Sequence, residues 1–170
     1  MTFAYVPVLL GVFRRPTTAL AGRSERRHQE PSNMAGWRCS ASSSVTAAFK
    51  FNPNFPVNTL MMMRGAVAAE QLGIFKPYVD QMYRFMWAEP RKMDDPAIVT
   101  ATWKERGFDA DKLSALIQDQ AVKDKLVANT QNSVERGTFG SPTFFVGDEI
   151  FFGKDRLRDV EDMIVESKAA

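Results

Sequence analysis

The sequence contains very little of the residue types on which several common enzyme chemistries depend. Among its 170 residues there is one cysteine, Cys39, and one histidine, His28. A single cysteine cannot form an internal disulfide, a Cys-x-x-Cys redox pair or a cysteine-rich zinc site. A single histidine leaves little for a metal cluster or for a Ser-His-Asp triad. We therefore expect neither a metal site nor a dithiol site.

Long apolar runs are also missing. The longest one, residues 3–13, has eleven residues and is interrupted by Pro7 and Gly11. A helix that spans a bilayer needs about 20 predominantly apolar residues, so we expect no membrane span.

The net charge of +2 hides an asymmetry along the chain. Residues 1–50 carry seven basic and two acidic side chains, a net of +5, which leaves −3 for residues 51–170. Binding to nucleic acid needs an excess of basic side chains on a shaped surface, so the mildly acidic main body disfavours that partner. The Arg- and Ser-rich composition of residues 14–46 is typical of an organellar transit peptide, but its basic stretch follows the apolar run instead of alternating with it. We expect a cytoplasmic protein, with an organellar location as the alternative.

Hydrophobic periodicity indicates a strand followed by a block of helices. Residues 3–13 (FAYVPVLLGVF) have the pattern of a buried strand that Gly11 ends. The core residues of this strand would be Val6, Val8, Leu9 and Leu10. Further along, the pattern predicts helices from about 59 to Gly73, 75 to 88, Pro96 to near Gly107, Asp109 through Ile117, and 120 to 136.

The C-terminal segment has a different period. Residues 143–147 and 149–152 indicate a β-hairpin with a turn at Gly147 and Asp148, and a last helix from about 155 to 167 should follow. One strand, a helical block, a hairpin and a terminal helix are the order of an α/β protein with a helical insertion.

The most informative stretch is FGSPTFFVGDEIFFGKDRL, residues 139–157. A small residue before Pro142 at the start of a strand is consistent with an ordinary edge strand. The alternative is a cis peptide bond between Ser141 and Pro142. Since only about 5–6% of X-Pro bonds in folded proteins are cis, the spacing by itself leaves both readings open.

This stretch resembles the C-terminal part of the 2-hydroxychromene-2-carboxylate isomerases and kappa-class glutathione transferases. FNPNFPVNTLMMMRGAVAAEQ, residues 51–71, resembles the segment that enters the helical insertion of the same family, and residues 3–13 resemble its second strand. The resemblance implies an α/β, thioredoxin-like (DsbA-like) sheet with an inserted all-helical block. Because residue 1 falls just before the second strand, we expect the first strand and helix to be missing.

Four regions follow from this resemblance. Residues 1–13 would be a remnant strand, 49–137 a loop with the helical insertion, and 138–170 the thioredoxin-like hairpin and helix. Residues 14–48 keep no family motif, and we expect them to be either disordered or translated out of the ancestral frame.

The resemblance also implies a site for glutathione and an adjoining site for an aromatic or chromene-like small molecule. The residues that match the family's glutathione-binding positions are Ser141, Pro142, Phe152, Gly153, Lys154 and Asp155. Those that match its substrate loop are Asn52, Pro53, Phe55 and Asn58. For Asp155 the alternative role is the N-cap of the last helix. Tyr83 and Trp87 are either walls of the substrate site or core residues.

No catalytic residue is assigned, because the family's serine lies in an N-terminal Ser-Pro-x-x-Tyr-like turn that we do not find in residues 1–50. The resemblance implies a glutathione-dependent isomerase or a kappa-like transferase, whose activity we expect to be impaired in this sequence because that serine is not found. It also implies a homodimer. The alternatives are a non-catalytic glutathione-binding module and a thiol-disulfide oxidoreductase, which Cys39 alone disfavours.

Overall fold

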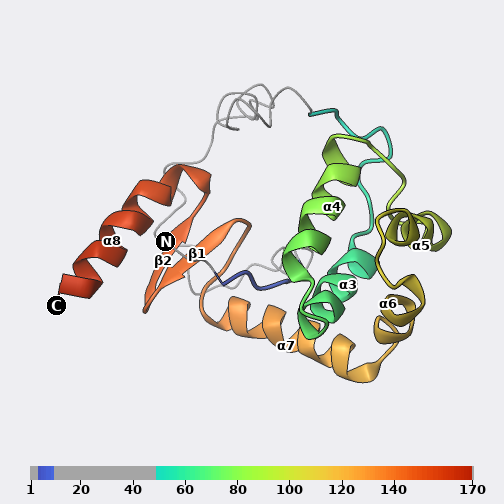
Figure 1. Ribbon diagram of the computed structural model, residues 1–170. Coiled ribbons are helices and arrows are strands. Elements are labelled where there is room, and N and C mark those ends of the chain that lie inside the picture. The colour runs from blue at the N-terminus through green and yellow to red at the C-terminus, as the bar shows by residue number, and fades with distance from the viewer. Residues whose placement is uncertain (1–3, 10–48, 170) are drawn as a thin grey trace. The chain divides into compact units, whose positions relative to one another are not determined.

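The structure is a computed structural model that describes residues 4–9 and 49–169 (Figure 1). Its elements in chain order are α3 (Leu60–Gln71), α4 (Phe75–Trp87), α5 (Pro96–Glu105), α6 (Ala110–Leu116), α7 (Gln120–Glu135), β1 (Thr143–Val146), β2 (Glu149–Phe152), the 3₁₀ turn η3 (Lys154–Arg156) and α8 (Leu157–Ala169). The chain divides into two compact units, and the division falls inside α7, between Lys123 and Asp124. Each unit is described by itself.

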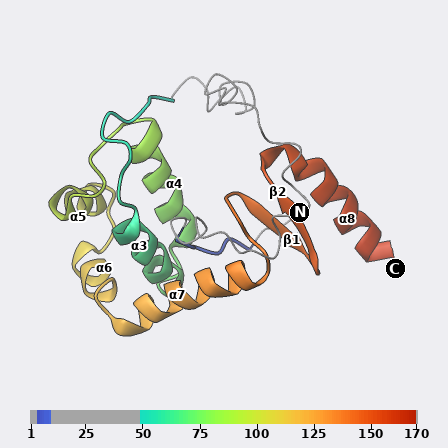
Figure 2. The same cartoon turned by 180° about the vertical axis from the view of Figure 1, so that it is seen from behind.

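The first unit holds the helical block, of which residues 49–123 are described. Helix α3 packs against α4 and α6, and α5 packs against α6, as Figures 1 and 2 show from opposite sides. Their contact faces enclose one apolar core, in which Tyr78, Phe85 and Trp103 are completely or almost completely buried. Burial of such aromatic side chains is the main source of stability for a bundle of this size.

The ends of these helices are fixed by local signals that the sequence predicts correctly. At the end of α3, Gly73 has a φ of 70°, its N–H donates to Glu70 C=O and the N–H of Ile74 donates to Ala69 C=O. This is the Schellman arrangement, which glycine favours because it adopts positive φ without strain. Asp95 caps α5 by accepting from Ala97 N–H, and Asp109 caps α6 in the same way.

The second unit holds the hairpin and the C-terminal helix. Strands β1 and β2 are antiparallel, with Thr143 opposite Phe152 and Val146 opposite Glu149, and the tight turn contains Gly147 at a φ of 59°. Helix α8 lies beside the hairpin and contacts β1. The hairpin and the last helix therefore lie where the sequence predicts them.

Residues 4–9 form no strand, and the expected strand at 3–13 is wrong for this described part. Val6 is 59% exposed instead of buried. The segment is bound by side chains of α7: Leu9 N–H donates to Thr130 Oγ1 at 3.0 Å, and Asn129 Nδ2 donates to Pro7 C=O. Pro7 has no N–H to donate to a neighbouring strand. An apolar run by itself therefore does not show that a segment pairs with another strand. Residues 3 and 10–13 of this prediction lie outside the described residues.

Within residues 4–9 and 49–169, none of the helices is long and apolar enough to cross a membrane.

Candidate functional site

The residues expected to bind glutathione come from two places in the sequence that the hairpin brings together. Because Thr143 pairs with Phe152, the segment before β1 lies next to the segment after β2. Gly153 N–H donates to Pro142 C=O at 2.9 Å. The Ser141–Pro142 peptide bond is cis, which is one of the two readings expected from the sequence. Ser141 and Pro142 are both exposed at this junction.

The backbone of Ser141 is open to a ligand. Within the described residues, no hydrogen bond uses its N–H or its C=O, whereas the neighbouring C=O groups of Gly140 and Pro142 accept from Thr143 Oγ1 and Gly153 N–H. An exposed backbone segment with a free donor and a free acceptor can pair with the backbone of a peptide.

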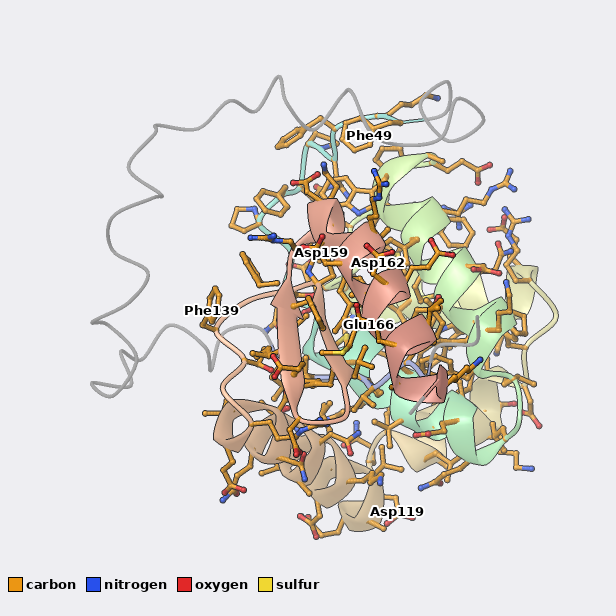
Figure 3. All side chains as sticks on the ribbon, turned by 90° about the vertical axis from the view of Figure 1, so that its left-hand side faces the viewer. Phe49, Asp119, Phe139, Asp159, Asp162 and Glu166 are labelled. Atoms are coloured by element: carbon orange, nitrogen blue, oxygen red, sulfur yellow. The ribbon has the colours of Figure 1, made fainter. Side chains whose placement is uncertain are left out.

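Two further residues belong to this junction, and the sequence reasoning missed them. A Cβ atom at Gly140 would lie 2.7 Å from the Phe152 ring, so the ring lies directly on the glycine. The Phe139 ring lies 4.5 Å from the Phe152 ring, centroid to centroid, and Phe139 is exposed at the surface beside the hairpin (Figure 3). In the motif FGSP, the glycine is the residue type that permits such a close approach of a ring to the backbone.

Lys154 and Asp155 follow the junction directly in the turn η3. Lys154 Nζ forms an ion pair with Asp155 Oδ1; the Lys154 side chain is about half exposed and that of Asp155 is largely exposed. Asp155 lies inside η3, whose N-cap is Gly153 without a side-chain cap hydrogen bond. The alternative role of Asp155, as the cap of the last helix, remains a prediction. One exposed ammonium beside one exposed carboxylate is complementary to the amino-acid end of glutathione, which carries one charge of each sign. The residues therefore fit this ligand.

The expected substrate residues lie in the other unit, in the loop before α3. Asn52 is completely buried: its Nδ2 donates to Arg91 C=O at 2.9 Å, and its Oδ1 accepts from Asn54 N–H at 2.9 Å. Asn58 is exposed, and its Oδ1 accepts from Leu60 N–H at the start of α3. Pro53 and Phe55 are exposed. Asn52 and Asn58 thus fix the backbone of the loop, and Pro53 and Phe55 are its accessible side chains.

Phe55 belongs to an aromatic cluster at the surface. Its ring lies 6.0 Å from the Trp87 ring, and Phe51 and Phe49 lie 6.5 Å and 5.6 Å from that same ring. Each of the three Phe side chains is about half exposed. Trp87 is half-buried, and Tyr83, which the sequence places on the same helix, is exposed and thus no core residue.

Five charged side chains surround the C-terminal end of α4. Glu89 accepts from Arg84 and Arg106, and Glu105 accepts from Arg91 at 2.6 and 3.1 Å. The hydrogen bond from Arg84 lowers the pKa of Glu89, and the one from Arg91 lowers the pKa of Glu105. Charge-assisted contacts of this kind favour the ionised carboxylates.

Comparison with known proteins gives a consistent family. Residues 42–165 match the family model described as DSBA-like thioredoxin domain. The chain is 29% identical over 108 residues to the 2-hydroxychromene-2-carboxylate isomerase of Pseudomonas sp. strain C18, which is 64% of this chain and 49% of the relative. The corresponding isomerases of Pseudomonas putida (29% over 80 residues; 47% and 39%) and Sphingobium xenophagum (28% over 92 residues; 52% and 46%) are similar in the same way. The chain spans about half the length, or less, of these curated relatives.

A solved structure of 2-hydroxychromene-2-carboxylate isomerase matches with a TM-score of 0.61 at 23% identity. The match covers 72% of this chain and 60% of that one. At this identity the match shows the fold. Together the comparisons confirm the resemblance drawn from the sequence motifs.

Proposed function

The chain belongs to the family of DSBA-like thioredoxin domains, and from this premise we propose that it acts as a glutathione-dependent isomerase of the 2-hydroxychromene-2-carboxylate type. The relatives that carry this name support the reaction class. The observation that carries the proposal is the junction at which Ser141, Pro142, Phe152 and Gly153 meet beside the Lys154–Asp155 pair.

In this proposal, the chain's own residues bind and orient the tripeptide. The N–H and C=O of Ser141 pair with its central residue, as one strand edge pairs with another. Asp155 accepts from the ammonium of the γ-glutamyl end and Lys154 donates to its carboxylate, so that the existing ion pair exchanges partners. When bound, glutathione supplies a thiolate, which is the nucleophile that this cysteine-poor chain lacks.

The aromatic or chromene-like substrate is assigned to the loop that carries Pro53 and Phe55. The exposed Phe55 ring beside Trp87 offers an apolar aromatic surface, and flat rings pack on such surfaces in offset or edge-to-face geometry. A homodimer and a cytoplasmic location belong to the same proposal and rest on the family relationship.

The test combines retention on immobilised glutathione with an isomerase assay on 2-hydroxychromene-2-carboxylate. Binding with turnover supports the proposal. Binding without turnover would replace it with a glutathione-binding module that does not catalyse, and absence of binding would contradict both.

A matched pair of variants locates the binding. Asp155→Asn should weaken retention about tenfold, because a charge-assisted hydrogen bond contributes about 1.5 kcal/mol or more. Asp159→Asn is the control, since Asp159 also pairs with a neighbouring cation, Arg156, but lies after the turn η3, near the start of α8 (Figure 3). Equal retention by the two variants would show that the γ-glutamyl end binds elsewhere.

A further inference from the structure

One buried side chain, that of Asn52, connects the turn at residues 52–55 by a hydrogen bond to the loop that follows α4. Asn52 holds the turn together, because its Oδ1 accepts from Asn54 N–H and its backbone C=O accepts from Phe55 N–H at 3.1 Å. The same side chain reaches across to Arg91 C=O at 2.9 Å. A completely buried amide needs such a partner, since an unpaired polar group in the interior is costly.

Arg91, which supplies this partner, is itself held at both ends. Its N–H donates to Phe85 C=O at 2.9 Å, at the end of α4. Its guanidinium donates to both oxygens of Glu105 on α5 and lies over the ring of the buried Phe85 at 4.1 Å. A forked, stacked contact of this kind fixes a side chain in a way that a lysine ammonium cannot reproduce.

We propose that Arg91 is a positioning residue, which fixes its own carbonyl where Asn52 binds and thereby sets the place of Pro53 and Phe55. A chain of contacts carries this effect: the Glu105 carboxylate holds the Arg91 guanidinium, the Arg91 backbone carbonyl accepts from the Asn52 amide, and Asn52 holds the turn. As far as the substrate is concerned, this inference rests on the proposed function. The attachment of the turn to Arg91 is independent of the proposed function.

The chain offers a matched control for this role. Arg84 also donates through two nitrogen atoms to a carboxylate, that of Glu89, in the same charged group. Within the described residues, no hydrogen bond joins Arg84 to the turn. Arg84→Lys and Arg91→Lys therefore remove similar ion-pair contacts, and only the second loosens the carbonyl that Asn52 binds.

The experiment measures hydrogen exchange of the Asn54 and Phe55 amides by NMR in the full chain. Arg91→Lys should raise both exchange rates about tenfold, and Arg84→Lys less than about twofold, because local opening controls exchange. If Arg91→Lys does not fold, Glu105→Gln weakens the same fork and should raise the two rates in the same direction. Equal rates in the two arginine variants, or unchanged rates in Arg91→Lys, would overturn the inference.

A second variant tests this chain of contacts. Asn52→Asp keeps the acceptor for Asn54 and removes the donor to Arg91, so it should raise the same two exchange rates. Combined with Arg91→Lys it should add little, since both changes break one connection, whereas its effect and that of Arg84→Lys should multiply. If the effects of Asn52→Asp and Arg91→Lys on the exchange rates multiply fully, Arg91 does not act on the turn through Asn52.

Kinetics then separate the two proposals. With 2-hydroxychromene-2-carboxylate as the substrate, Arg91→Lys should raise KM more than it lowers kcat, and Arg84→Lys should leave both near the wild-type values. A wild-type protein without isomerase activity counts against the proposed function, while the exchange rates still decide whether Arg91 positions the turn.

Discussion

At the scale of single residues, Gly65 shows how one missing side chain organises the helical core. It lies in the middle of α3, where glycine normally weakens a helix. A Cβ atom at this position would lie 2.0 Å from the Tyr78 hydroxyl oxygen, which donates to Met62 C=O at 3.1 Å. The absence of a side chain at 65 is thus what allows Tyr78 to reach the α3 backbone. Burial also raises the pKa of Tyr78 far above its ordinary value, so the hydroxyl stays protonated and remains a donor.

We expect Gly65→Ala to destabilise the protein by about 1–3 kcal/mol, although alanine is the better helix former, because overpacking outweighs helix propensity. Denaturant unfolding measures this change. Adding Tyr78→Phe should recover part of the loss, since it removes the atom nearest to the new methyl group. If the two substitutions are simply additive, the clash with Tyr78 is not the cause.

Part of the candidate site can be predicted from residue types in the sequence, and part of it cannot. Ser141 and Pro142 could be selected from a local motif, and the structure joins them to Gly153. The buried Asn52 could be selected but not interpreted, because its partner at Arg91 is 39 residues away in the sequence. Contacts of that separation leave no pattern in a single sequence.

At the scale of elements, the charged group at the end of α4 connects that helix to α5 by ion pairs. Glu89 and Glu105 together face Arg84, Arg91 and Arg106. Both carboxyl groups have a lower pKa in the folded protein than their ordinary value of 4.5. Their contribution to stability is therefore complete above the unfolded-state pKa and is lost as the pH falls through the folded-state pKa.

The wild-type protein should accordingly lose stability as the pH falls below about 5, in proportion to the protons taken up on unfolding. A double variant, Glu89→Gln with Glu105→Gln, should be less stable than wild type at pH 7 and show a weaker dependence in this acidic range. Thermal unfolding at a series of pH values measures both effects. If the stability of the two proteins depends on pH in the same way, carboxylates other than Glu89 and Glu105 cause the loss of stability in acid.

The elements also show which signals in a sequence are local. Helix α5 was predicted closely because its cap, Asp95, and its first residue, Pro96, are neighbours in the chain. The hairpin was predicted for the same reason, with its turn at Gly147. Residues 4–9 were predicted wrongly because a strand requires a partner strand, and what binds Pro7 and Leu9 instead is a pair of side chains on α7.

At the scale of the whole molecule, the apolar core is distributed unevenly between the two units. The large, fully buried side chains of the first unit include Tyr78, Phe85 and Trp103. Among the described residues of the hairpin, by contrast, none of β1 or β2 is fully buried. Stability within a protein follows such differences, because regions with little buried surface open more easily.

We therefore expect amides of α3 and α4 to exchange at least about 100-fold more slowly than those of β1 and β2 under native conditions. Hydrogen exchange followed by NMR gives the rates for each residue. Similar protection in both units would mean that the two unfold as one cooperative body.

The close contact of Gly140 with the Phe152 ring has a consequence for how this family can vary. A Cβ atom at position 140 would lie 2.7 Å from the Phe152 ring, so a residue larger than glycine there requires the ring to shift or a smaller residue to stand at 152. We therefore expect that, among relatives, a side chain larger than glycine at position 140 is accompanied by a residue smaller than phenylalanine at position 152.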